Sequence, residues 1–282
     1  MSRSQVKAAV SARDALDGAR TAITAGGSPS PGLDAELLVA AALGVARERL
    51  HADPDLPVAG DAVRTLQSFV RRRSVDREPI AYILGRRGFR HIEVSVDPGV
   101  LIPRPETELL VEVGLELPPG ARVLDVATGS GAVALALADE RPDLLVTGTD
   151  ISPAALAVAR GNGTRLGLAV DWEEADLLAG LPGPWDAILA NLPYVPTRVL
   201  AGLEPEVARH EPRLALDGGP DGLDLVRRLI DQAAAAAVGV LGLEVGDDQA
   251  PEVHRLLTGA GFARVDRRRD LAGVERVLVG RR

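Results

Sequence analysis

From about residue 101 onward, short apolar runs alternate with longer segments whose apolar residues recur at helical spacing. Such alternation is typical of βαβ units, in which parallel strands form a sheet and helices cover its faces. The apolar runs predict strands at Arg122–Val126, Leu144–Asp150, Ala169–Glu174, Ala187–Asn191, Val238–Val245, Ala263–Arg267 and Val274–Val279. The helical segments between them include Ala132–Asp139, Pro153–Leu166 and Gly222–Ala236. The pattern therefore predicts a doubly wound, mostly parallel α/β sheet.

The two final predicted strands are joined only by residues 268–273. A parallel crossover needs about a dozen residues or more, so these two strands should pair antiparallel. A sheet of about seven strands that ends in an antiparallel hairpin differs from a plain dinucleotide-binding sheet.

Helical spacing also marks the N-terminal part of the chain. It occurs in Val6–Leu16, Leu33–Ala41 and Val63–Val70, which predicts a small helical bundle over residues 1–76. The last of these segments runs into Arg71-Arg72-Arg73. We interpret this triplet as positive charge that complements a helix C-terminus, rather than as a nucleic-acid patch.

Residues 77–100 have a different pattern from the bundle. Ile92, Val94 and Val96 alternate with polar residues after a glycine-containing stretch, which predicts a β-hairpin. We interpret residues 77–100 as a hairpin linker that leads into the α/β domain at residues 101–282.

Composition excludes several kinds of site. The chain has no cysteine, which excludes disulfides, thiolate zinc sites and a cysteine nucleophile. Its 4 histidines show no ligand spacing, so no metal site is expected. The formal net charge of -8 argues against a broad phosphate-neutralising surface, so no direct binding of nucleic acid is expected.

The sequence gives no sign of a membrane segment. Charged residues interrupt the N-terminal stretch, and the longest apolar stretch, Ala233–Leu243, is too short to span a bilayer. We therefore expect a cytoplasmic protein. Separately, we expect a monomer.

A glycine-rich turn follows the strand predicted at Arg122–Val126. Glycines in such a turn let the backbone approach a ligand closely, and Asp125 could accept a cationic group such as an amino acid's ammonium. The turn consists of Ala127, Thr128, Gly129, Ser130 and Gly131. Asp150 ends the next strand, where a carboxylate can accept both hydroxyls of a ribose. Together these features indicate a cofactor that contains a nucleoside.

The same turn also fits the G-x-G-x-x-A form of NAD-binding proteins, with Asp150 near the expected spacing. Three features count against NAD. Asp125 puts a carboxylate where a pyrophosphate would lie, the sheet ends in an antiparallel hairpin, and the residues after Ala187–Asn191 have no task in NAD chemistry. S-adenosylmethionine, which carries a ribose, an ammonium and a sulfonium, fits better. Asp176, after the third strand, could bind an adenine amino group or be an ordinary solvated loop carboxylate.

The tetrapeptide Asn191-Leu192-Pro193-Tyr194 ends the fourth predicted strand, at the sheet edge where ligands bind in open α/β folds. It combines an amide side chain, a main-chain carbonyl held extended by the next proline, and an aromatic face. Asn191 and the Leu192 carbonyl could accept the two hydrogens of a planar NH2 group, while Tyr194 packs against its plane. Such a site could present an amide or amino nitrogen to an electrophile. The structural alternative is an ordinary strand-to-loop turn.

Three longer segments match a known family, namely Glu78–Gly85, Val100–Glu112 and Glu211–Leu223. Through these segments and the NPPY-type tetrapeptide, the chain resembles the bacterial peptide chain release factor N5-glutamine methyltransferases over nearly its full length. Those enzymes use S-adenosylmethionine to methylate the side-chain amide of the glutamine in a Gly-Gly-Gln loop. The resemblance implies a helical domain that recognises the factor, and a methyltransferase domain with a seven-stranded sheet.

The resemblance implies cofactor contacts from the turn Gly129-Ser130-Gly131, from Asp150 and from Asn191. Together with the residues considered above, the candidate cofactor-binding residues are Asp125, Ala127, Thr128, Gly129, Ser130, Gly131, Asp150, Asp176, Leu177 and Asn191. The candidate catalytic residues, which would bind the substrate glutamine, are Asn191, Leu192, Pro193 and Tyr194.

Three positions depart from the family's usual sequence. Ala127 stands where glycine is usual, so we expect its backbone to avoid a conformation that only glycine tolerates. Leu192 replaces the first of two prolines, but the acceptor required there is a main-chain carbonyl, and Leu192 still precedes Pro193. Leu177 stands where the family often carries an aromatic near the adenine.

Two other functions remain open from the sequence. The tetrapeptide also resembles the motif of rRNA dimethyladenosine methyltransferases, and an exocyclic adenine amine offers the same two hydrogens. The alternative is therefore an adenine-N6 methyltransferase acting on RNA or DNA, although the lack of a basic–aromatic tract speaks against it. A non-catalytic cofactor-binding or ribosome-associated module is a further possibility, against which the intact Asn191 and Tyr194 argue.

Overall fold

The computed structural model describes residues 9–282, which divide into two compact units. One unit contains the chain up to Gly85 together with Pro205–His210, and the other contains Arg86–Glu204 and Glu211–Arg282. We call these the helical unit and the sheet unit. The helical unit thus extends past the boundary expected at residue 76, and it includes a short segment from much later in the chain.

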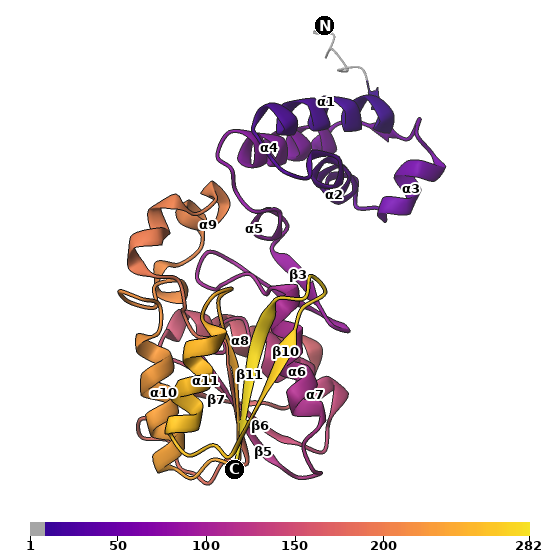
Figure 1. Cartoon of the computed structure of the whole chain (residues 1–282). Helices are drawn as coiled ribbons and strands as arrows, with labels where there is room; N and C mark the ends of the chain where they lie inside the picture. The colour runs from indigo at the N-terminus through magenta and orange to yellow at the C-terminus, as the bar shows by residue number, and fades with distance from the viewer. Residues whose placement is uncertain (1–8) are drawn as a thin grey trace, which may run out of the picture. The chain divides into compact units, whose positions relative to one another are not determined.

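The helical unit combines helices with one short strand pair (Figure 1). Its helices are α1 Ala12–Ala25, α2 Pro31–Leu43, α3 Arg47–Ala52, α4 Asp61–Ser74, α5 Ile80–Leu84 and α9 Pro205–His210, and its strands are β1 Val10–Ser11 and β2 Pro57–Val58. Val10 pairs with Val58, so the helix expected from Val6 onward begins only at Ala12. The Ser11 hydroxyl caps that helix by accepting a hydrogen bond from the Asp14 N–H at 3.1 Å. Val6 lies outside the described residues.

The helical unit has its own apolar core. Ile23 of α1, Leu38 of α2 and Leu50 of α3 are almost fully buried within one cluster. Full burial of side chains of this size contributes roughly 1.5–3 kcal/mol each, which explains why helical spacing was sufficient to predict the bundle.

The arginine triplet lies in the last turn of α4, as predicted, but Arg73 is buried rather than solvated. Its guanidinium donates hydrogen bonds to Asp34 at 2.6 Å and to Glu206 at 2.7 Å. Arg77 donates to both carboxylate oxygens of Glu206, at 2.9 and 2.8 Å. Because Glu206 belongs to α9, this ion-pair cluster attaches Pro205–His210 to the helical unit.

The sheet unit begins with the hairpin predicted within residues 77–100, which is formed by β3 Arg86–Phe89 and β4 Ile92–Ser95. Its main sheet contains β5 Arg122–Val126, β6 Leu145–Asp150, β7 Asp171–Glu174, β8 Ala187–Ala190, β9 Val240–Glu244, β10 Arg264–Arg269 and β11 Glu275–Arg281. Its helices are α6 Glu108–Leu115, α7 Ala132–Glu140, α8 Pro153–Leu166, α10 Asp224–Ala235 and α11 Ala250–Gly259, with 3-10 turns η1 Pro105–Thr107, η2 Thr197–Gly202 and η3 Arg213–Ala215.

The seven strands of this sheet lie in the order β10-β11-β9-β8-β5-β6-β7. Strands β5 to β9 pair in parallel, whereas β11 is antiparallel to both of its neighbours. The predicted α/β class and the predicted antiparallel C-terminal hairpin are therefore confirmed. The order reverses direction at β5 and β8, so the carboxyl ends of these two strands flank the crevice where ligands bind in such sheets.

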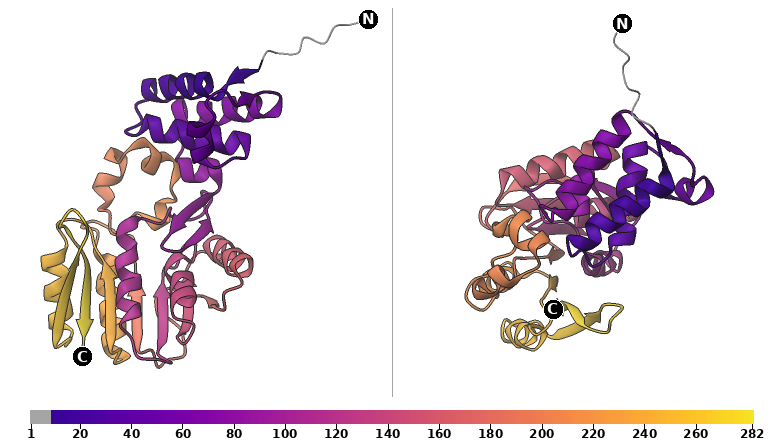
Figure 2. Two further views of the ribbon diagram at one scale, coloured as in Figure 1. Left: turned by 90° about the vertical axis from the view of Figure 1, so that its right-hand side faces the viewer. Right: turned by 90° about the horizontal axis from the view of Figure 1, so that it is seen from above.

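Helices cover both faces of the sheet. Figure 1 shows α10 and α11 on one side of the strands and α6 and α7 on the other, and the magenta helix α6 lies in front of the strands in the left view of Figure 2. Ile188, Leu241 and Leu243 of the central strands pack with Val226 and Val253 of α10 and α11 in one buried cluster. Within residues 9–282, no helix has the length and apolar character needed to cross a membrane.

Candidate active site

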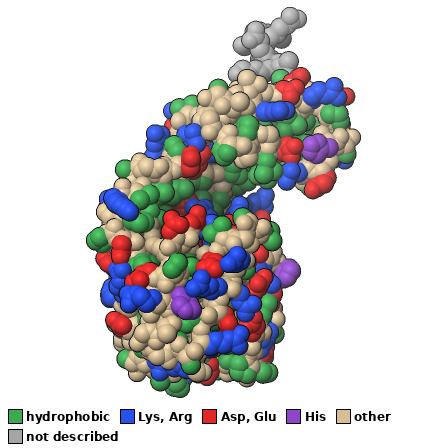
Figure 3. Space-filling model, viewed as in Figure 1, with side chains coloured by type: hydrophobic (Ala, Val, Ile, Leu, Met, Phe, Trp, Pro, Cys, Tyr) green, Lys and Arg blue, Asp and Glu red, His purple; other side chains and the backbone are tan. Residues whose placement is uncertain are grey.

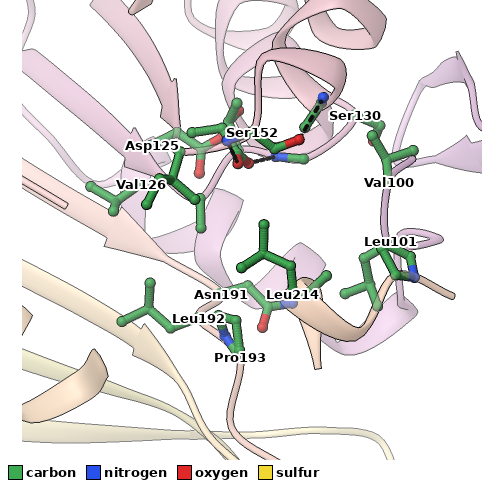
Figure 4. A pocket seen from close by; sticks show the side chains of 18 of the residues that line it. Val100, Leu101, Asp125, Val126, Ser130, Ser152, Asn191, Leu192, Pro193 and Leu214 are labelled. Atoms are coloured by element: carbon green, nitrogen blue, oxygen red, sulfur yellow. Dashed lines mark hydrogen bonds between the residues drawn. The ribbon is translucent and has the colours of Figure 1, made fainter. Parts of the chain in front are cut away.

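A cavity of about 240 Å³ opens at the carboxyl ends of the central strands of the sheet unit (Figure 4). It is lined by residues 99–101, Pro103, Thr107, residues 125–130, Ala132, Val133, residues 150–152, Ala155, residues 175–177, residues 191–193, Pro212, Leu214, Ala215, Leu225 and Arg228. Figure 4 shows Asp125 and Ser130 on one side of this cavity, Asn191 and Pro193 on another, and Val100 and Leu101 on a third. The structure therefore brings together most of the candidate residues, although they come from four different strand ends.

The glycine-rich turn connects β5 to α7. Gly129 has a φ of +57° and faces open space on the cavity side, so a ligand can approach its backbone closely. Gly131 has a φ of +82°, and a Cβ at this position would lie 2.8 Å from the Trp172 ring. Gly131 therefore serves the close packing of the turn against β7, and it is not among the residues that line the cavity.

The expectation for Ala127 was wrong. Its φ is +57°, which is the left-handed conformation that glycine adopts freely and that costs other residues about 1–2 kcal/mol. The turn thus holds Ala127 in a conformation that suits glycine, at the cost of backbone strain at this alanine. Strain of this kind is found most often at functional sites.

Asp125, near the end of β5, is 2% exposed. Its Oδ2 accepts hydrogen bonds from the Thr128 hydroxyl at 2.5 Å and from the Ala134 N–H at 3.1 Å. Burial raises the pKa of Asp125 to about 7, although both hydrogen bonds act in the opposite direction. A cationic group placed in the cavity beside Asp125 would favour the ionised carboxylate.

Asp150 ends β6 and faces the same cavity. One carboxylate oxygen accepts from the Gly129 N–H at 3.0 Å and the other accepts from the Ser152 N–H at 2.9 Å. Burial raises the pKa of this carboxyl above its ordinary value, and the backbone hydrogen bonds oppose the shift. Each oxygen retains acceptor capacity, so the carboxylate is oriented but still able to receive hydroxyl groups.

Asp176 and Leu177 follow β7, and both line the cavity. The Asp176 carboxylate is half-exposed and pairs with Arg228 of α10 at 2.7 Å. Leu177 is 6% exposed and has a φ of +55°, so its side chain forms part of the apolar wall. Arg228 was not anticipated here, because nothing in the local sequence of α10 marks it as a partner of a loop after β7.

Asn191 lies directly after β8, and its Nδ2 donates a hydrogen bond to the Thr107 hydroxyl oxygen at 3.1 Å. Leu192 is 2% exposed, with its side chain in the apolar core. No described residue donates a hydrogen bond to the Leu192 carbonyl oxygen. Asn191, Leu192 and Pro193 line the cavity.

Tyr194 does not contribute to the cavity lining, unlike the three residues before it. Its carbonyl accepts a hydrogen bond from the Gln249 side chain at 2.9 Å, and Val195 bonds to Leu216 and Gly218. Burial raises the pKa of the Tyr194 hydroxyl to about 12. The segment after β8 is thus braced by several hydrogen bonds, and the Tyr194 phenol stays protonated at neutral pH.

Two of the segments that carry the family resemblance meet at this site. Arg104 pairs with Glu211 at 2.5 Å, and the Ile102 N–H donates to the other oxygen of Glu211 at 3.4 Å. Leu214 and Ala215 of η3 follow this pairing and line the cavity, where Figure 4 shows Leu214 across from Asp125. Reasoning from the strand ends alone missed these residues, and the matching segments were the only sequence signal for them.

Comparison with known proteins gives two family matches within the chain. Residues 14–85 match the PrmC N-terminal domain, and residues 123–210 match a methyltransferase domain. Among solved structures, the hMettl16 catalytic domain in complex with an RNA hairpin has a TM-score of 0.57 at 14% identity, covering 78% of this chain and 81% of that one. A methyltransferase from Pyrococcus furiosus has a TM-score of 0.50 at 18% identity, covering 67% and 87%. These two structures support the fold alone.

Curated relatives are much more similar. The release factor glutamine methyltransferase of Rhodospirillum rubrum is 41% identical over 95% of this chain and 84% of its own length. The enzymes of the same name from Deinococcus radiodurans and Moorella thermoacetica are 42% and 43% identical, each over 96% of this chain and 98% of their own length. The chain therefore belongs to the release factor glutamine methyltransferase family.

Proposed function

We propose that this protein transfers a methyl group from S-adenosylmethionine to the side-chain amide nitrogen of the glutamine in the Gly-Gly-Gln loop of peptide chain release factors. Full-length similarity to release factor glutamine methyltransferases supports the reaction and the substrate class. The observation that carries the proposal in this structure is the orientation of Asn191, whose NH2 group is used by Thr107. Its Oδ1 is thereby left as an acceptor, which is what a substrate NH2 requires.

The donor and acceptor groups of the cavity fit S-adenosylmethionine. Asp150 would accept the ribose hydroxyls, Asp125 would face the ammonium, and Gly129 leaves open space beside the backbone. Leu177 and Ile151 would provide apolar surface for the adenine. When bound, this cofactor supplies an electrophilic methyl group on a sulfonium.

Two acceptors would hold the substrate amide. The Asn191 Oδ1 and the Leu192 carbonyl oxygen would each accept one of its N–H bonds. Leu192 supplies its carbonyl without moving, because its side chain is fixed in the core and Pro193 keeps its backbone extended. The leucine in place of the family's usual proline therefore preserves the acceptor.

These contacts address the chemical difficulty of the reaction. An amide nitrogen is a poor nucleophile because its lone pair is delocalised into the carbonyl group. Acceptors on both N–H bonds increase electron density on the nitrogen and fix its position, and such positioning is worth up to about 7–11 kcal/mol. The methylated nitrogen is cationic and acidic, so it can release its proton to water without a dedicated base.

Tyr194 would pack against the amide plane of the substrate glutamine. Its phenol stays protonated at neutral pH and therefore cannot act as a base, and we assign the ring a packing role. Tyr194 directly follows three residues that line the cavity, so its ring would contact the amide from the edge of the cavity.

The proposal includes the setting in which the enzyme acts. Release factors work on cytoplasmic ribosomes, so the enzyme would act in the cytoplasm, and as a monomer that binds the factor directly. On the face shown in Figure 3, acidic and basic side chains are mixed over the sheet unit, without a patch of one sign. That face therefore lacks the clustered positive charge that a nucleic-acid backbone requires.

A transfer assay tests the proposed substrate. Labelled S-adenosylmethionine is supplied with purified release factor, with a release factor whose loop glutamine is replaced by alanine, and with rRNA. We expect label in the first factor only. Label that appears only in the RNA would refute the proposal and would support the adenine-N6 alternative.

The variant Asn191→Ala tests the site. It removes one acceptor, so we expect transfer to fall by at least about a hundredfold, as for other groups that orient or stabilise the reacting atoms. The unfolding midpoint should stay near that of the wild type, since Asn191 makes one described side-chain hydrogen bond. Transfer at the wild-type rate would remove Asn191 from the mechanism.

A further inference from the structure

Glu244 is a buried carboxyl that the mechanism above does not use. It is the last residue of β9 and is 2% exposed, yet it forms no ion pair with any of the described residues. Its Oε2 has no hydrogen-bond partner within residues 9–282. Burying such a group costs free energy, so its presence beside a reaction site points to a functional reason.

The sheet register places Glu244 beside the substrate site. Strands β8 and β9 are parallel, and Ala190 aligns with Leu243, so the next residues, Asn191 and Glu244, lie side by side at the carboxyl edge. Thr107, the last residue of η1, is 5% exposed and contacts Asn191 through its hydroxyl. This hydroxyl accepts from the Asn191 Nδ2 at 3.1 Å. The Thr107 side chain is also close enough to the Glu244 carboxyl to lower its pKa.

A hydroxyl has one hydrogen to donate, and that single hydrogen decides the direction of the whole chain of bonds. If Thr107 donates to Glu244, its lone pairs face Asn191, and Asn191 must present its NH2 to Thr107. The Asn191 Oδ1 then points away from Thr107 and is available to a substrate NH2. If Thr107 instead donates to Asn191, the amide turns over and offers the substrate a donor where an acceptor is required.

We propose that Glu244 and Thr107 are positioning residues that fix the side-chain amide of Asn191 with its oxygen toward the substrate. The inference rests on the proposed function, because it assigns a substrate NH2 to the Asn191 oxygen. Thr107 lines the cavity and Glu244 does not, and we assign both a role that acts through Asn191. Burying the Glu244 carboxylate without an ion pair costs free energy, but it provides a strong hydrogen-bond acceptor beside Thr107.

The state of Glu244 connects this orientation to pH. Burial raises the pKa of Glu244 to about 7, although the hydrogen bond from Thr107 opposes the shift. Glu106 raises the pKa further, whereas Arg276 and Arg104 lower it. A protonated Glu244 can donate to Thr107, which frees the Thr107 hydrogen for Asn191 and permits the reversed amide.

The decisive pair of variants is Thr107→Val and Thr107→Ser. Valine has the shape of threonine without the hydroxyl, whereas serine keeps the hydroxyl. At saturating S-adenosylmethionine, we expect Thr107→Val to lower kcat by about tenfold or more, and Thr107→Ser to stay within about threefold of the wild type. The Kd of S-adenosylmethionine and the unfolding midpoint should change little in both variants, which shows that both are folded.

The variant Glu244→Gln supplies a readout that a merely structural role would not move. Wild-type kcat should fall as the pH drops below about 7, where Glu244 becomes protonated. Glutamine does not titrate, so Glu244→Gln should show a flatter profile over the same range. At saturating S-adenosylmethionine, the ammonium of the cofactor would favour the ionised Asp125 and lower its pKa, which moves that titration away from pH 7.

A second measurement needs no substrate. The side-chain amide signals of Asn191, assigned by their loss in Asn191→Asp, should shift with a midpoint near pH 7 in the wild type and not in Glu244→Gln. A wild type that methylates no release factor but shows this shift would refute the proposed function and keep the positioning role. The positioning role would be overturned if Thr107→Val kept the full kcat, or if Thr107→Ser lost as much kcat as Thr107→Val. It would also be overturned if the Asn191 amide signals shifted in the same way in the wild type and in Glu244→Gln.

Discussion

The strained alanine of the cofactor turn gives a prediction whose size can be worked out from the structure. Ala127 has a φ of +57°, which costs an alanine about 1–2 kcal/mol, and Ala127→Gly removes that cost. Glycine gains about 0.4–1 kcal/mol of conformational freedom in the unfolded chain, which acts against the variant. Loss of a half-buried methyl group costs about 0.4 kcal/mol more. The net result is a stabilisation of roughly 0.4 kcal/mol from the middle of these ranges.

Two matched alanines make this small difference measurable. Ala237, two residues after the end of α10, also has a positive φ, of +53°, but it is exposed and loses no packing. Ala237→Gly should therefore stabilise the protein by about 0.8 kcal/mol. Ala157 is exposed in the interior of α8, where glycine costs about 1 kcal/mol relative to alanine. From most to least stable, the three variants and the wild type should rank Ala237→Gly, Ala127→Gly, wild type and Ala157→Gly.

Thermal unfolding followed by circular dichroism measures this order. One kcal/mol corresponds to about 2–4 °C for a domain of this size, so Ala127→Gly should unfold about 3–6 °C above Ala157→Gly. Transfer activity should persist in Ala127→Gly, because the turn already has the shape that glycine adopts. An Ala127→Gly variant as unstable as Ala157→Gly would refute the argument that strain is stored at this position.

Three further predictions follow from the titratable groups. Burial raises the pKa of Asp125 from 3.8 to about 7, so the folded state holds a proton that the unfolded state releases, and stability falls as the pH rises across this interval. Asn does not titrate, so the urea midpoint of Asp125→Asn should fall less between pH 5 and pH 8 than that of the wild type. An equal fall in both proteins would contradict the prediction. Burial tends to raise the pKa of Glu206, but hydrogen bonds from Arg77 and Arg73 lower it below 4.5. The stabilisation from Glu206 is therefore present above about pH 4.5, and it is lost as the pH falls through the pKa of the folded state. Glu206→Gln should therefore destabilise the protein by about 1–3 kcal/mol at pH 7 and by less in acid, and a penalty that does not shrink on acidification would contradict the pairing. Tyr194→Phe should keep transfer within about threefold, whereas Tyr194→Ala should lose tenfold or more, because the ring packs and the hydroxyl does not titrate near neutrality. A Tyr194→Phe variant as inactive as Tyr194→Ala would show that the hydroxyl has a chemical role.

Much of the sheet unit followed from the sequence because its signals are local. The strand predicted at Arg122–Val126 is β5 with the same bounds, and the helix predicted at Pro153–Leu166 is α8. Parallel strands place their carboxyl ends on one edge, so the sequence alone predicts that Asp125, Asp150 and Asn191 lie at one site. The cavity between them agrees with that expectation.

Contacts between distant segments did not follow from the sequence. Glu206 lies in a six-residue helix without an apolar stripe, and its arginine partners are 133 and 129 residues away. Nothing local marks such a segment as part of the helical unit, because the ion pairs that hold it exist only once the chain has folded. The backbone of Ala127 was mispredicted for a related reason, since the surrounding turn imposes a conformation that alanine by itself disfavours.

The position of Glu244 depends both on a local sequence signal and on contacts between distant segments. In the sequence it ends an apolar run, and a carboxylate there looks like the point where a buried strand meets solvent. The register between β8 and β9 places it beside Asn191 instead, and η1 brings the Thr107 hydroxyl to Asn191 from outside the sheet. The topology of the sheet therefore determines which side chains share an edge, but the direction of their hydrogen bonds depends on a residue that the sheet does not contain. For this reason the strand pattern could predict the acceptor Asn191, and only the folded structure could indicate what holds its amide in the reactive orientation.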